Sequence, residues 1–253
     1  MYIVSWSFWT AAAAISDWSA SPPPELALLA VLLFLFGTIA PSLVALLLTA
    51  RASGREETLT LLRRTVRCEV GARWYVFAIT YMAAVKFTVA LLHRIATGAW
   101  AKVRSNSLVH HGDSDCFSTP VQAGEEIGWR GYALPRLIKH FGLAQASIVL
   151  GVIWACWHLP FFFIPRSDNA GQAFPVYLLA VTALSVPMAW LYWRTNGSLL
   201  LTMLMHAAIN NTASIVSSPA SAATNPFKLR QFHCMAHCWR VMAGRCFFLV
   251  ENA

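Results

Sequence analysis

One long apolar run constrains this chain more than any other feature. From Glu25 to Ala50 the sequence is almost uninterruptedly apolar, with a single proline at position 41. A helix needs about 20 apolar residues to cross the hydrocarbon core of a bilayer, and this run is longer. Six arginines follow it in a short stretch, which is the pattern of the positive-inside rule: Arg51, Arg55, Arg63, Arg64, Arg67 and Arg73. We predict a transmembrane helix whose end faces the cytoplasm.

The composition agrees with a chain whose main solvent is lipid. Of its 253 residues, 57% are apolar and only 12% are charged, whereas soluble domains carry about 25% charged residues. A net charge of +8 could suggest nucleic acid. The arginine segment explains it better through membrane topology, so we predict no nucleic-acid partner. The six cysteines form no compact framework, and we expect no disulfides.

Further apolar segments predict an all-α, polytopic transmembrane bundle. An interfacial amphipathic helix is expected over 51–71. Further helices are expected over 74–97, 121–140, 143–163, 174–193 and 198–216. The turn sequences Phe141-Gly142 and Asn196-Gly197 separate neighbouring segments. The prediction is six spanning or partly inserted helices, or seven if residues 2–15 insert, enclosing a polar intramembrane cavity.

Three regions are expected along the chain. Residues 1–24 contain no Lys or Arg, so they lack the basic start of a cleavable signal peptide and should stay attached. Residues 25–216 form the membrane domain, in which the polar stretch 100–120 must be a loop outside lipid. Residues 217–253 are a basic tail. We therefore expect an integral, multi-pass membrane protein, located in the plasma membrane if the source is prokaryotic.

Ionisable side chains within apolar helices are energetically unfavourable, so each is a candidate for function. Among the eleven acidic residues, only Glu125 and Glu126 lie within such a helix. Glu126 and Arg130 are four residues apart in the favourable order, and we predict that they pair. Glu125 is turned about 100° away. Without a fixed cation in a hydrated pocket, its carboxylate suits a general base working near neutral pH. The alternative is that both acids only make polar contacts between helices.

Two other apolar helices carry polar groups. One holds His158 four residues after Trp154, and the other holds His206 and Asn210 on a common face. With the two glutamates, they supply a base, a proton carrier and two donors, which is the set that amide hydrolysis by water needs. The chain has no His-Glu-x-x-His motif, no Asp within a span and no Gly-x-Ser-Gly motif. Glutamate-based hydrolysis is the protease chemistry that remains.

Three motifs, in this order, resemble those of the CPBP family, which comprises type II CAAX prenyl endopeptidases, bacteriocin-processing enzymes and Abi proteins. They are Glu-Glu-x-x-x-Arg at 125–130, aromatic-x-x-x-His at 154–158 and His-x-x-x-Asn at 206–210. The prototype of the second motif has Phe where this chain has Trp154. The resemblance implies that Glu125 activates water with help from His158. It also implies that Arg130 holds Glu126 and that the third motif, His206 with Asn210, binds the oxyanion.

The resemblance implies an intramembrane CAAX-type endopeptidase. Its partners would be the lipid bilayer and a membrane-associated peptide or protein, either prenylated or bacteriocin-like. We favour a mechanism without a cofactor; the alternative is Zn²⁺ held by Glu125, His158 and His206. The His and Cys clusters at 110–116 and 233–238 are interpreted as incidental.

Two other functions stay open at this point. A non-catalytic immunity or scaffold protein would capture a peptide with the same polar cluster. A transporter would be expected to show paired repeats with broken helices, and no clear repeat is visible in the sequence.

Overall fold

The computed structural model describes residues 1–17, 24–100, 124–164, 167 and 169–212. Within these residues it contains six α-helices, one π-helix and two 3-10 helices, and no strand, so the predicted all-α fold is confirmed. The chain divides into two units, 1–70 with 121–204 and 71–120 with 205–253, and each is described by itself. The predicted loop beyond residue 100, the predicted tail and the clusters at 110–116 and 233–238 lie outside the described residues.

Four helical stretches are long and apolar enough to cross a membrane. They contain α2 (Pro24–Arg63), α3 (Ala72–Thr97), α5 (Leu134–Trp157) and α6 (Phe174–Arg194). Two shorter helices, α1 (Tyr2–Asp17) and α7 (Leu199–Thr212), complete the set of α-helices in the described chain. The prediction of six or seven inserted helices therefore corresponds to four long spans and two shorter helices.

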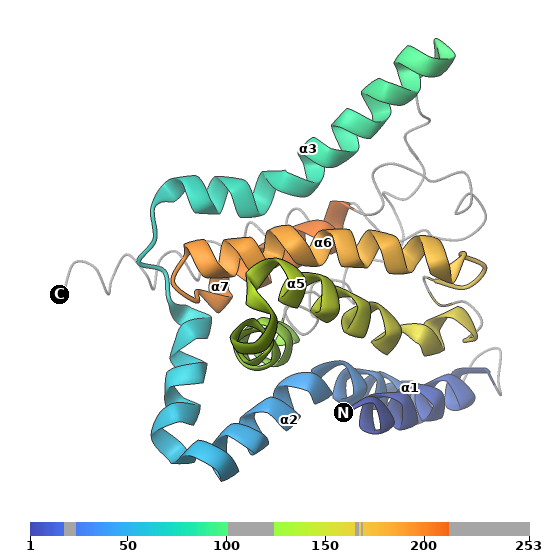
Figure 1. Ribbon diagram of the computed structural model, residues 1–253. Helices are drawn as coiled ribbons and strands as arrows, with labels where there is room; N and C mark the ends of the chain where they lie inside the picture. The colour runs from blue at the N-terminus through green and yellow to red at the C-terminus, as the bar shows by residue number, and fades with distance from the viewer. Residues whose placement is uncertain (18–23, 101–123, 165–166, 168, 213–253) are drawn as a thin grey trace. The chain divides into compact units, whose positions relative to one another are not determined.

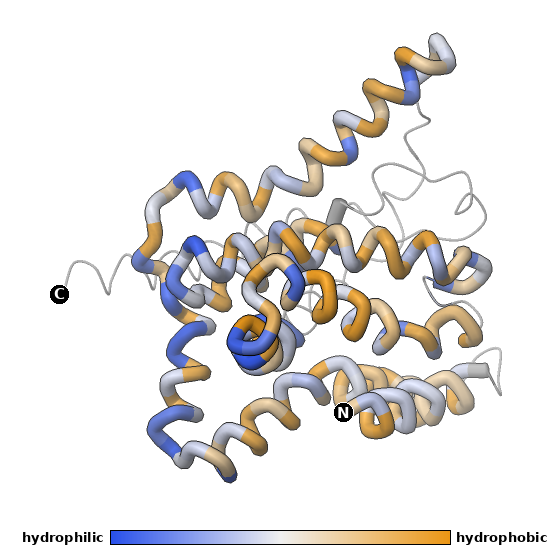
Figure 2. The backbone as a smooth tube through the Cα atoms, viewed as in Figure 1, coloured by the Kyte–Doolittle hydropathy of each residue, from blue (hydrophilic) through white to orange (hydrophobic). Residues whose placement is uncertain are grey.

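Helix α2 changes direction and character at Gly54. This residue has φ +79° and ψ −172°, a conformation that glycine adopts without steric cost. Before Gly54 the helix is apolar and exposes side chains such as Leu28 and Leu47, whereas after it the helix is rich in charged residues (Figure 2). The predicted change in character after the membrane helix is present, with its break at Gly54 instead of after Ala50.

Helices of the first unit pack in close pairs, α1 along α2 and α5 along α6 (Figure 1). Small residues permit this approach. A Cβ atom at Gly151 would lie 2.7 Å from the Cα of Thr182 in α6, and one at Gly37 would lie 2.6 Å from the Trp9 side chain of α1. Glycine at these positions therefore sets how closely the helices approach.

Two predicted turns have the expected backbone conformation. Gly142 interrupts α5 with φ +70°, and the turn between α6 and α7 has φ +51° at Asn196 and φ +80° at Gly197. The segment predicted to be helical up to residue 163 ends earlier, because α5 stops at Trp157. Pro160 has no N–H to continue the α-helix, and the 3-10 helix η4 (Leu159–Phe162) follows instead.

Helix α1 docks on the C-terminal end of α5. The Tyr2 hydroxyl donates to the Ile153 carbonyl, and Trp6 Nε1 donates to the Trp157 carbonyl at 2.9 Å. The last carbonyls of a helix have no intrahelical donor, so Trp6 satisfies one of them. Trp9 packs on Trp157 with ring centroids 4.5 Å apart. Through these contacts α1 holds the end of α5.

Two of the six arginines tie the end of α2 to the turn between α6 and α7. After α2 the chain forms the 3-10 helix η1 (Arg64–Val66). Arg64 Nη1 donates to the Tyr192 hydroxyl at 2.8 Å, and Arg67 Nη1 donates to the Asn196 carbonyl at 2.5 Å. The Ser198 hydroxyl in turn donates to the Arg67 carbonyl at 2.7 Å. These two arginines therefore have a packing role.

Candidate active site

The first predicted motif lies at the start of a π-helix, η3 (Ile127–Ala133). The sequence predicted a helix here without this irregularity. The backbone N–H of Leu134 bonds to the carbonyl of Trp129, five residues earlier. Helix α2 supports this stretch, because the Ser42 hydroxyl donates to the Gly124 carbonyl at 2.5 Å, and Gly128 lies against the Pro41 backbone. Short π-helical turns occur frequently at functional sites.

The predicted ion pair between Glu126 and Arg130 is confirmed and lies in the protein interior. Arg130 Nη1 is 2.7 Å from Glu126 Oε1, and both side chains are 0% exposed. Arg130 Nη2 also donates to the Met188 sulfur of α6 at 3.3 Å. The guanidinium carbon lies 4.3 Å from the ring centroid of Trp154, so a cation–π contact adds to the pair.

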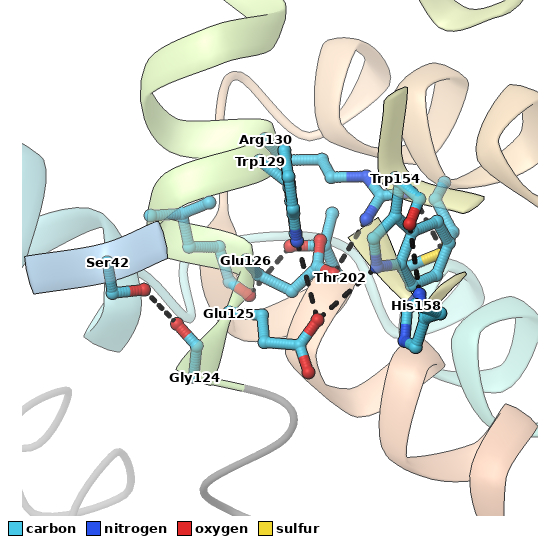
Figure 3. Close-up of polar contacts among 11 residues, drawn as sticks. Ser42, Gly124, Glu125, Glu126, Trp129, Arg130, Trp154, His158 and Thr202 are labelled. Atoms are coloured by element: carbon cyan, nitrogen blue, oxygen red, sulfur yellow. Dashed lines mark hydrogen bonds and ion pairs between the residues drawn. The ribbon is translucent and has the colours of Figure 1, made fainter. Parts of the chain in front are cut away.

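The carboxylate of Glu125 is buried, with 3% of the residue exposed. Two indole groups hold it: Trp129 Nε1 donates to Oε2 at 3.4 Å, and Trp154 Nε1 donates to the same oxygen at 3.3 Å (Figure 3). N–H donors favour the ionised form of a carboxylate, which is the form that can accept a proton. The geometry thus suits the predicted role of Glu125 as a base.

His158 lies at the C-terminal end of α5, close to the same tryptophan. Its Nδ1 is 2.9 Å from the Trp154 carbonyl. A carbonyl oxygen can only accept, so Nδ1 carries a proton. Aromatic rings of Trp157 and Tyr177 lie edge-on to the imidazole, with centroids 4.9 and 5.7 Å away. In a neutral ring this arrangement leaves Nε2 as the proton acceptor.

His206 and Asn210 belong to the second unit and are described by themselves. They lie four residues apart on α7, so they share a face of one helix as predicted. His206 is buried, with 4% of the residue exposed, and Asn210 is half-buried. The structure thus brings four of the six predicted residues together in the first unit and places the other two one helical turn apart.

Residues 116–212 match the sequence model of a family described as type II CAAX prenyl endopeptidase Rce1-like. We call residues 116–212 the Rce1-like region, because they are similar to this family model. A CAAX prenyl protease 2 from Methanococcus maripaludis is 30% identical to the chain over 92 residues, which are 34% of this chain and 34% of that protein. The chain therefore spans about a third of the length of the curated relative that it matches.

The Rce1-like region contains all three motifs that suggested the CPBP family, so the match supports the predicted resemblance. The same match, together with the four long apolar helices, makes the chain an integral, multi-pass membrane protein. Within the described ranges, no group of three or more His, Cys, Asp and Glu side chains could hold a metal ion. Among the described residues, neither Cys68 nor Cys156 forms a disulfide.

Sequence reasoning missed the polar role of two tryptophans in the Rce1-like region. Trp129 was only an unassigned position in the first motif, and Trp154 was only the aromatic residue of the second motif. The spacing of Glu125 and Trp129, four residues on one helix, is a signal that could have indicated their contact. No comparable signal existed for Trp154, which lies 29 residues from Glu125.

Proposed function

We propose that this protein is an intramembrane endopeptidase that hydrolyses a peptide bond of a membrane-associated substrate, with Glu125 as the base that activates water. The observation that carries the proposal is the buried carboxylate of Glu125, held by two indole donors beside the Glu126–Arg130 pair. The Rce1-like match and the name of the archaeal relative support a prenylated CAAX protein as the substrate. A bacteriocin-like peptide is the alternative substrate.

The proposed reaction consumes one water molecule. Glu125 removes a proton from water, and the resulting hydroxide oxygen forms a bond to the scissile carbonyl carbon. The electrons of the C=O double bond move to oxygen and give a tetrahedral oxyanion. When the C=O bond re-forms, the C–N bond breaks and the leaving nitrogen takes the proton from Glu125. The products are a carboxylic acid and an amine, as amide hydrolysis requires.

The other residues have supporting roles in this scheme. Nε2 of His158 accepts a hydrogen bond from the attacking water and helps to orient it. Arg130 neutralises Glu126 and packs on Trp154, so it maintains the wall of the site. We assign His206 and Asn210 to the oxyanion on the basis of the third motif alone, because such donors stabilise the developing charge.

The decisive experiment compares the wild-type chain with Glu125→Gln. Purified protein in liposomes is incubated with a farnesylated CAAX peptide, and new termini of membrane proteins are also mapped in cells expressing either form at matched levels. General-base catalysis contributes about 10²–10⁴-fold, so the variant should lose activity by that factor. Glu57→Gln, at an exposed glutamate of α2, is the matched control and should retain full activity.

The proposal is wrong if Glu125→Gln cleaves as fast as the wild type. If the wild type yields no new termini but protects cells or retains a bound peptide, the immunity or scaffold function is favoured instead. The cellular experiment also distinguishes the two substrate classes, because it identifies the cleaved proteins directly.

A further inference from the structure

We propose that Trp154 is a positioning residue that orients the carboxylate of Glu125 and connects it to His158. The inference rests on the proposed function, because it assigns Glu125 the role of base. It goes further by giving a specific task to an indole N–H, which the phenylalanine of the family's prototype motif cannot perform.

Trp154 contacts Glu125, Arg130 and His158, three of the four predicted site residues of the first unit (Figure 3). Its Nε1 donates to Glu125 Oε2 at 3.3 Å, and its ring lies 4.3 Å from the guanidinium carbon of Arg130. Its backbone carbonyl accepts from Nδ1 of His158 at 2.9 Å. The residue is only 4% exposed, so these contacts are made away from solvent. One residue thus connects the base, the ion pair and the histidine.

The contact with Arg130 strengthens the contact with Glu125. A cation over the face of an indole draws electron density from the ring, and polarised groups make better hydrogen-bond donors. The positive charge of Arg130 therefore acts on Glu125 through Trp154, although the ion pair of Arg130 is with Glu126. The consequence is that Arg130 helps Trp154 to hold the carboxylate of Glu125 in place.

Trp129 donates to the same carboxylate oxygen, but its contribution differs. It lies four residues from Glu125 on the same helical stretch, so it fixes the rotamer of Glu125 relative to its own helix. Trp154 belongs to α5, the helix that ends next to His158. Its hydrogen bond therefore sets the position of the base relative to the histidine, and the bond from Trp129 does not.

The test is Trp154→Phe in the full-length protein, with Trp157→Phe as the matched control. Trp157 lies one turn away on α5 and is also buried, but its Nε1 has no hydrogen-bond partner in the described part of the chain. Both changes remove the same ring volume, and only Trp154→Phe removes a donor from Glu125. The other charged or titratable groups of the cluster, Glu126, Arg130, His158 and the Tyr177 hydroxyl of α6, stay in both variants.

Two readouts follow the ionisation of Glu125. A hydrophobic carbodiimide reacts with protonated carboxyl groups, and mass spectrometry of the labelled peptide gives the midpoint of Glu125 labelling against pH. The pH profile of kcat/KM for peptide cleavage gives the acidic limb, which is the pH range in which activity falls as the pH is lowered. A hydrogen bond to a charged group is typically strong enough to shift such midpoints by about one to two pH units.

The direction of the shift follows from the chemistry. The donor stabilises the ionised carboxylate, so without it Glu125 stays protonated to a higher pH. In Trp154→Phe the labelling midpoint and the acidic limb should both move up by about one to two units, while in Trp157→Phe they should stay in place. Activity near neutral pH should fall about tenfold through kcat.

An unchanged midpoint in Trp154→Phe, or an equal shift in Trp157→Phe, would overturn the inference. If Trp154→Phe does not fold, benzothienylalanine at position 154 keeps the ring shape and replaces only the N–H by sulfur, and the same outcomes apply. Carbodiimide labelling needs no peptidase activity. A failure of the proposed function, with no cleavage by the wild type, is therefore distinguished from a failure of the role given to Trp154.

Discussion

Removing one partner of the buried Glu126–Arg130 pair is expected to destabilise the protein far more than removing both. Arg130→Met leaves the Glu126 carboxylate at a position with no solvent exposure. Breaking a buried pair from one side costs about 3–5 kcal/mol in the free energy of unfolding. Glu126→Leu leaves the guanidinium of Arg130 buried without its carboxylate partner. Each single variant should therefore lose a similar amount of stability.

The double variant Glu126→Leu/Arg130→Met should be close to the wild type. Buried ion pairs can often be replaced by apolar residues of similar volume with a neutral or stabilising effect. The pair in this protein is also incompletely satisfied, because Arg130 Nε has no hydrogen-bond partner within the described residues. The single variants therefore sum to about 6–10 kcal/mol, and the coupling energy should exceed about 3 kcal/mol.

The measurement is reversible unfolding in mixed micelles, followed by tryptophan fluorescence as denaturing detergent is added. Glu57→Leu and Arg63→Met, at exposed positions of α2, serve as the control cycle and should be additive within about 0.5 kcal/mol. Additive losses in the Glu126 and Arg130 cycle would refute the reasoning, because they would mean that neither charge depends on the other for its burial.

Two further predictions concern packing and metal content. Gly128→Ala places a Cβ 2.6 Å from the Pro41 backbone, so overpacking should lower the free energy of unfolding by about 1–3 kcal/mol. The control is Gly124→Ala, whose Cβ would meet no atom within 4 Å. This control should leave the unfolding midpoint nearly unchanged. Equal midpoints for the two variants would contradict the close contact of η3 with α2. The proposed mechanism uses no metal. Protein purified with a chelator should therefore contain no stoichiometric zinc by elemental analysis and should keep its peptidase activity. If activity is lost and zinc restores it, Glu125, His158 and His206 are favoured as metal ligands instead.

The sequence by itself determined the features that depend on local spacing. Apolar runs long enough for lipid predicted the long helices, and Gly142, Asn196 and Gly197 marked turns because they tolerate positive φ. The pairing of Glu126 with Arg130 followed from four-residue spacing on one helix. Each of these features involves residues close together in the chain, where the geometry of a helix is enough to relate them.

The tertiary structure decided what joins distant residues. The bond from Trp154 to Glu125 spans 29 positions and the bond from Trp6 to Trp157 spans 151, and no periodicity encodes either. The sequence also did not predict the π-helix. Its glycines, Gly128 and Gly131, contact residues of other helices, and only the fold shows those contacts. Helix spacing predicts which side chains share a face, but only packing decides which group that face meets. The sequence could therefore name the candidate base and the histidine, and the fold was needed to show the tryptophan that contacts both.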